Sequence, residues 1–154
     1  MAANDQARKR FNKALKYLRM FLQDTAELNR LTRDQELDDE ELRFCIDMAI
    51  SDFNTTLPPT PAKTINTYPS LYLLMHGAAI QALTMAGIRQ SRNELNYQSG
   101  GSSFIRSNKT AHYQSWISMF KNDYEQKKRA LKIAGNVSRG YGGVFSEYDY
   151  VGFW

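Results

Sequence analysis

Apolar side chains recur at helical intervals near the start of the chain. The spacing is four, three and four residues, which places the side chains on one face of a helix. This stripe consists of Phe11, Leu15, Leu18 and Leu22. We expect the helix to be capped at Asn4 or Asp5, because such side chains accept hydrogen bonds from first-turn amides. Residues 24–37 have mixed periodicity and are interpreted as the helix end followed by a polar loop.

A second helix is predicted to begin at a cluster of acids. Asp38 is positioned to cap it, and Glu41 to reach back as in a capping box. The acids Asp39, Glu40 and Glu41 lie where the helix dipole favours negative charge. Its apolar stripe is Leu42, Ile46, Ala49, Ile50 and Phe53, with Cys45 beside it as a small buried apolar residue. Pro58, Pro59 and Pro61 stop this helix.

The third predicted helix is rich in alanine and methionine. It starts near Thr67, places Pro69 in its first turn, and ends near Gln90. Its buried side is predicted to contain Leu71, Leu74, Met75, Ala78, Ala79, Ala82, Met85 and Ala86. Because so many of these side chains are small, another helix can approach closely, and we expect this helix to lie at the centre of the core.

A fourth helix is predicted from about Asn108 to Ala134, stopped by Gly135. Its apolar side is Tyr113, Trp116, Ile117, Phe120, Tyr124 and Leu131. Its other side is basic and is expected to face solvent, with Lys121, Lys127, Lys128, Arg129 and Lys132. Between the third and fourth helices, the turn Gly100-Gly101 predicts a short β-hairpin. A phosphate-binding glycine loop is disfavoured, because no buried strand precedes the glycines and no Lys-Ser/Thr follows at the required spacing.

The last twenty residues form a glycine-rich and then densely aromatic segment. We expect a helical domain over 1–134 and a flexible aromatic tail over 135–154. The tail aromatics are Tyr141, Phe145, Tyr148, Tyr150, Phe153 and Trp154. Exposed rings are an apolar liability, so the tail either packs over its own helices or docks into another chain. We favour docking, which makes these six residues a predicted partner-binding site.

Composition narrows the class of protein. A chain of 154 residues suits one domain, and 42% hydrophobic residues argue against general disorder. No run of about 18 apolar residues is present, so we expect no membrane contact. The polar, basic start does not look like a signal peptide, and a single cysteine excludes an internal disulfide. These features indicate synthesis and folding in a reducing cytoplasm.

Charge is unevenly distributed along the chain. Residues 1–19 carry six bases and one acid, residues 24–52 carry ten acids and three bases, and residues 53–154 carry eleven bases and five acids. An acidic middle between basic ends can pair within one subunit or between copies. It does not resemble the continuous basic face of a nucleic-acid-binding protein.

Catalytic groups are scarce in this sequence. His76 and His112 are the only imidazoles, and no nucleophile signature surrounds a serine or Cys45. We interpret His76 as a core or boundary residue, because no second metal ligand lies at helical spacing. The carboxylates at 34–41 are explained by a capped helix start and do not match a calcium loop. The sequence therefore predicts a protein that is not an enzyme and has neither cofactor nor metal.

A series of loose motifs lies along residues 11–132. It consists of Tyr17-Leu18-Arg19 with Asp24, Asp38 to Leu42, Ala49 to Asn54, Ala78-Ala79, Ser99-Gly100-Gly101, and the helix holding Tyr113, Tyr124 and Lys132. In the order of these elements the chain resembles the head–tail connector (adaptor or neck) proteins of tailed bacteriophages. The basic start and the 135–154 extension depart from that pattern.

The resemblance implies a structural virion protein. Such subunits are mainly α-helical and form a ring, usually of twelve copies, beneath the portal, where it extends the DNA channel. The implied partners are further copies, the portal and the next neck or tail protein, with DNA only as passing cargo. The acids Asp38, Asp39 and Glu40 would face a neighbour's Lys121, Lys127, Lys128 and Arg129. The aromatic tail would engage the portal or an adjacent ring, and the location would be the neck of the virion.

Two other interpretations stay open. A small helical nucleic-acid-binding protein would use the basic residues of the fourth helix and Arg139, with Trp116 or the tail aromatics stacking on bases. An enzyme or accessory subunit would be favoured if His76 and His112 lay together in a cleft.

Overall fold

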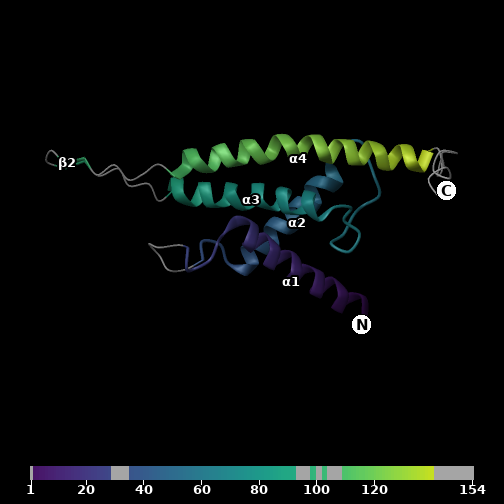
Figure 1. Ribbon diagram of the computed structural model, residues 1–154, viewed down its shortest axis with the longest axis horizontal. Coiled ribbons are helices and arrows are strands. Elements are labelled where there is room, and N and C mark those ends of the chain that lie inside the picture. Colours follow the sequence, from purple (N-terminus) through teal and green to yellow (C-terminus); the bar gives the residue numbers. More distant parts are fainter. Residues whose placement is uncertain (1, 29–34, 93–97, 100–101, 104–108, 141–154) are drawn as a thin grey trace, which may run out of the picture.

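The computed structural model describes residues 2–28, 35–92, 98–99, 102–103 and 109–140, which form a mainly helical structure (Figure 1). The described residues contain four helices, α1 (Ala2–Leu22), α2 (Asp39–Thr55), α3 (Leu71–Arg92) and α4 (Lys109–Gly140). Two short strands, β1 (Gln98–Ser99) and β2 (Ser102–Ser103), pair antiparallel. A bundle of four helices was the fold predicted. The turn at Gly100 and Gly101 lies outside the described residues and stays a prediction.

Helix α1 buries the apolar stripe that the sequence predicts. Leu15 and Leu18 are buried, while Phe11 and Leu22 are partly buried and pack against the same core cluster. The helix begins at Ala2, so the predicted cap at Asn4 or Asp5 is wrong. Helical backbone extends past those residues.

Helix α1 ends in a left-handed residue. Gln23 has a φ of 55° and its side-chain amide donates to the Met20 carbonyl at 2.8 Å. A residue in this conformation commonly closes a helix, and here the chain turns towards Asp24.

Helix α2 confirms the predicted capping box. The Asp38 carboxylate accepts from the Glu41 amide at 2.7 Å, and the Glu41 carboxylate accepts from the Asp38 amide at 2.9 Å. All five residues of the predicted stripe are buried. Cys45 is fully buried, and this burial raises the pKa of its thiol to about 11. The thiol is therefore an inert core group, as predicted.

Helix α3 is the central helix of the core, as its small residues predicted. It lies between α2 and α4 and contacts α1 as well (Figure 1). By length and composition α3 alone among the described helices could cross a membrane, and its ten buried residues account for this apolar character. At Gly77 a Cβ would lie 3.0 Å from both the Ala49 Cβ and the Tyr124 ring, so this glycine permits the close approach of three helices.

The predicted start of α3 is wrong. The Leu74 amide donates to the Ser70 carbonyl at 3.1 Å, so Ser70 opens the helix, whereas Thr67 belongs to a separate turn with Thr64. Pro69 consequently lies before the helix. Leu71 is 51% exposed instead of buried, because it stands in the first turn at the edge of the core.

Helix α4 is longer than predicted. It continues past Gly135 to Gly140, which makes it about 48 Å long. A single helical glycine costs only about 1 kcal/mol, and Asn136 fixes the helix beyond it by donating to the Pro59 carbonyl at 3.1 Å. The predicted stop at Gly135 is therefore wrong. The helix runs antiparallel to α3 and extends beyond it (Figure 1).

Candidate assembly interface and adjoining pocket

The predicted basic face of α4 is only partly a solvent face. Lys121 and Arg129 are exposed, and Lys127 pairs with Asp123 at 2.9 Å beside the Tyr72 ring. Lys128 and Lys132 are each only 1% exposed, so their predicted exposure is wrong. The two lysines follow the buried Tyr124 at intervals of four residues, which places all three on the face that packs against the bundle.

Lys128 is satisfied within its own chain. Its ammonium lies 2.8 Å from the Asp52 carboxylate and 2.8 Å from that of Glu125, and stands over the Tyr124 ring. The Tyr124 hydroxyl donates to the same Asp52 oxygen at 2.7 Å. This arrangement joins α2 to α4 and leaves Lys128 unable to reach a neighbouring subunit.

Lys132 meets the C-terminal end of α2. Its ammonium donates to the Thr56 carbonyl and lies 5.0 Å from the centre of the Phe53 ring. A cation is favoured at this end of a helix because the carbonyls there carry partial negative charge. Burial, and secondly the charge of Lys128, lower the pKa of Lys132.

The acids at the start of α2 are also used internally. Asp38 forms the helix cap, and Asp39 pairs with Arg19 at 2.6 Å. Glu40 is exposed. Among the three acids predicted to contact a neighbouring subunit, Glu40 is therefore the one that forms neither a helix cap nor an ion pair with the described residues.

Arg19 and Asp24 bind the segment that precedes α2 and hold it against the end of α1, so that they act as a clamp. The sequence did not indicate this contact. Arg19 donates to the Leu37 carbonyl at 3.1 Å and lies 3.5 Å from the Asp24 carboxylate. Asp24 in turn accepts from the Glu36 and Leu37 amides at 2.7 and 3.0 Å. These amides are 12 and 13 residues from Asp24, so no local sequence pattern could have indicated the contact.

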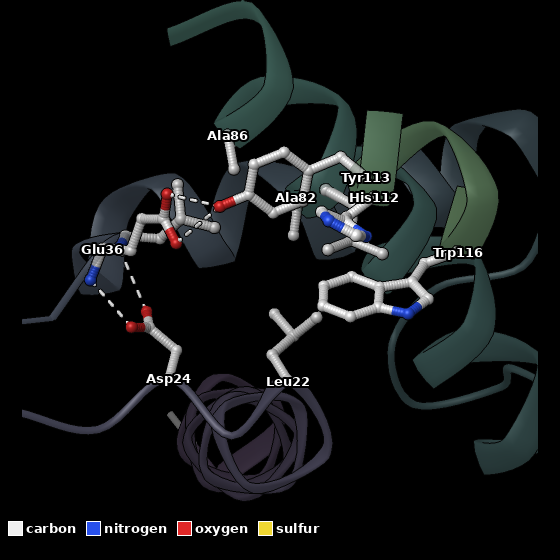
Figure 2. Close-up of a pocket in the computed structure, with 10 residues that line it drawn as sticks. Leu22, Asp24, Glu36, Ala82, Ala86, His112, Tyr113 and Trp116 are labelled. Carbon is white, nitrogen blue, oxygen red and sulfur yellow. Dashed lines mark hydrogen bonds between the residues drawn. The ribbon is translucent and has the colours of Figure 1, made fainter. Parts of the chain in front are cut away.

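A pocket of about 420 Å³ opens beside this clamp (Figure 2). Its apolar wall comes from the end of α1, from Leu37 and from α3, and its aromatic wall from the start of α4. The lining residues are Leu22, Asp24, Glu36, Leu37, Ala82, Leu83, Ala86, His112, Tyr113 and Trp116. Figure 2 shows Asp24 and Glu36 at one side of the space and the Trp116 ring at the other. The size falls within the range of ligand pockets.

The polar side of the pocket carries negative charge. The Tyr113 hydroxyl donates to the Glu36 carboxylate at 2.9 Å, and Gln90 donates to it at 3.3 Å. Burial, followed by the hydrogen bond to Glu36 and its charge, raises the pKa of Tyr113. The nearby cation Arg89 is directed elsewhere, to the Glu36 main-chain carbonyl and the Glu41 carboxylate.

Trp116 differs from its prediction. The sequence placed it in the core stripe of α4, but it is 48% exposed, because it lies at the edge of the α3–α4 contact. Its ring stands 6.1 Å from that of Tyr113, at the mouth of the pocket.

An aromatic cluster lies where α1, α3 and α4 meet. The His76 ring is 5.2 Å from Phe21, 5.4 Å from Phe120 and 3.9 Å from Tyr72, measured between ring centroids. His76 is buried, in agreement with its prediction as a core or boundary residue. His112 instead lines the pocket, so the two histidines have different surroundings.

Many large apolar side chains are exposed on this small protein. They occur on all four helices and are the kind of surface that subunit contacts bury. The set includes Met20, Phe21, Leu28, Phe44, Met48, Leu57, Leu71, Tyr72, Ile88, Trp116, Met119, Ile133 and Val137. On α4, Ile133 and Val137 lie one turn apart and are 46% and 51% exposed.

Other predicted site residues cannot be placed. The six tail aromatics, from Tyr141 to Trp154, and the turn glycines Gly100 and Gly101 lie outside the described residues. Within the part of the chain that is described, no group of three or more His, Cys, Asp or Glu side chains is arranged to hold a metal ion.

Comparisons with protein-family models, with curated proteins and with solved structures each found no match to this chain.

Proposed function

We propose that this protein is a structural subunit that works by repeated self-association, as a head–tail connector of a tailed bacteriophage. In this proposal about twelve copies form a ring beneath the portal, in the neck of the virion, and extend the DNA channel. The observation that carries the proposal is the amount of apolar surface that a single copy leaves uncovered. Among the described residues, thirteen large apolar side chains are exposed, including a pair near the end of α4.

The helical body suits a load-bearing ring component. Helix α4 is about 48 Å long and is fixed to α2 by Lys128 and Lys132 and to α3 through Tyr113 and Tyr124. A helix held in this way keeps the two ends of the subunit at a fixed distance from each other. The paired strands β1 and β2 come between α3 and α4 in the chain and would contact a neighbour in this proposal.

Within this proposal, fewer residues of α4 can form the predicted ion pairs with a neighbouring subunit. Lys128 is buried and paired, so Lys121 and Arg129 are the residues of that set best placed to meet acids of a neighbour, such as Glu40. Burial of Lys128 and Lys132 also weakens the nucleic-acid-binding alternative, because neither lysine is on the exposed basic surface that would contact phosphates.

The proposal is tested by deleting residues 141–154. We expect the truncated protein to fold with its four helices intact, because α1 to α4 bury their apolar stripes against one another, and to fail to join virus particles. Circular dichroism checks the fold, and the copy number of the protein in purified particles checks assembly. A matched control replaces the six tail aromatics by serine at unchanged length and should fail in the same way. Normal incorporation of the truncated protein would refute the proposed role of the tail, and absence of the intact protein from particles would refute the function itself.

A further inference from the structure

The densest run of exposed cations lies near the start of α1. Arg8, Lys9 and Arg10 are consecutive and exposed. Arg10 donates to the Asn66 carbonyl, but within the described part of the chain Arg8 and Lys9 have no partner. With Lys128 and Lys132 buried, this helix end is the strongest unpaired basic feature available for an inter-subunit contact.

The pocket at the other end of α1 has complementary chemistry. Its polar side presents the Glu36 carboxylate, whose described partners are the neutral groups of Tyr113 and Gln90. The Asp24 carboxylate beside it is already paired with Arg19 and with main-chain amides, so Glu36 carries the charge that a cation would meet. The opposite wall of the pocket offers the half-exposed ring of Trp116 (Figure 2). Apolar and aromatic walls accommodate the aliphatic stem of a lysine or arginine, and the carboxylate side accommodates its charge.

The basic run and the pocket cannot meet within one copy. Arg8 and Lys9 belong to the first half of α1, whereas Leu22, which lines the pocket, is the last residue of this 21-residue helix. The helical rise from Arg8 to Leu22 is about 21 Å. A second copy is therefore needed to bring one surface to the other. Because the two surfaces differ, the contact is head-to-tail, which closes a ring when the rotation per subunit divides the circle.

We propose that the Arg8–Lys9 segment of one copy docks into the acidic, Trp116-lined pocket of the next copy. This inference rests on the proposed function, and it names the contact by which the ring propagates. A single ion pair of this kind is weak, but every subunit in a closed ring makes it twice, once with each surface.

The first test measures occupancy of the pocket without requiring assembly. The protein carries Trp154→Phe, so that Trp116 is its only tryptophan, and is titrated with a synthetic peptide of residues 2–16. We expect a saturable change in Trp116 fluorescence that weakens as salt is added. Replacing Arg8 and Lys9 by alanine in the peptide, or Glu36→Gln in the protein, should each weaken binding by about tenfold. Glu36→Gln keeps an oxygen that can accept from Tyr113, and Lys16→Ala in the peptide is the control for loss of one charge elsewhere.

Equal binding by the wild-type and alanine-substituted peptides would overturn the inference, as would no fluorescence change at millimolar peptide. A third peptide, residues 141–154 with Trp154→Phe, tests another occupant. If it perturbs Trp116 and the basic peptide does not, the pocket binds the aromatic tail and the present assignment is wrong.

The second test uses complementary variants of the full chain. Arg8→Ala/Lys9→Ala keeps the pocket but loses the basic run, whereas Glu36→Gln keeps the basic run but impairs the pocket. Each variant should assemble at least about tenfold more weakly than the wild-type protein, and an equimolar mixture should form dimers at concentrations where neither variant assembles alone, because one intact contact remains between the two variants. Native mass spectrometry reports the species. If wild-type protein forms rings and both variants do too, this contact is wrong while the proposed function stands. If wild-type protein never assembles although the peptide binds, the ring function is wrong.

Discussion

Lys128 illustrates what a single buried charge does in this fold. The side chain is 1% exposed, yet its ammonium has two carboxylate partners, Asp52 and Glu125, and lies over the Tyr124 ring. Its stem fills space that an apolar residue would otherwise take. The carboxylates are partly exposed, so water screens part of the attraction. Lys128 therefore acts mainly as a specific link between α2 and α4.

We expect Lys128→Ala to lower the free energy of unfolding by about 2 kcal/mol, because it removes both the buried stem and the partner of Asp52. Lys128→Met restores the stem and should recover about half of that loss. Lys121→Ala, an exposed lysine on the same helix, is the control and should change stability by less than about 0.5 kcal/mol. Urea unfolding followed by circular dichroism measures all three. A loss for Lys128→Ala no larger than for Lys121→Ala would contradict this account.

At the scale of elements, periodicity predicted all four helices and the capping box predicted the start of α2, whereas the predicted starts of α1 and α3 and the predicted end of α4 were wrong. The capping box of α2 and its five-residue stripe depend on neighbouring residues, and both are as expected. The side-chain environments that were predicted wrongly or not predicted depend on contacts between segments that are distant in the sequence. The sequence of α4 alone predicts that Lys128 and Lys132 face solvent. In the fold they bind Asp52 of α2 and the carbonyl of Thr56, which follows α2. Likewise, the pocket joins the end of α1 to the start of α4, which no local pattern reports.

Alanine substitutions at two helical glycines, Gly77 in α3 and Gly135 in α4, should have opposite effects on stability. Gly77→Ala should destabilise the protein by about 1–3 kcal/mol, because the new Cβ would lie 3.0 Å from Ala49 and Tyr124. Gly135→Ala meets nothing within 4 Å and should stabilise it by about 0.5–1 kcal/mol through the higher helix propensity of alanine. Thermal and urea unfolding measure both. If Gly135→Ala gives no gain, the continuity of α4 through this residue is in doubt.

At the scale of the molecule, the uncovered apolar surface calls for partners. Ile133 and Val137 lie one turn apart in the C-terminal part of α4, and both are about half exposed. A neighbouring face of the same segment is held to the bundle by Lys132 and Asn136. The exposed side is thus presented by a fixed helix, which lowers the entropic cost of docking against a neighbouring subunit.

Replacing Ile133 and Val137 together by glutamine should therefore weaken assembly by about tenfold or more while leaving the monomer stable, since the change removes apolar area that the monomer does not bury. Sedimentation velocity over a range of concentrations measures the shift. The control is Leu57→Gln, which removes exposed apolar area at a position outside the helices. Because glutamine is a good helix former, loss of α4 would not explain a defect. Equal weakening by Leu57→Gln would mean that any apolar loss matters, and unchanged assembly of the α4 variant would exclude this face from the subunit contact.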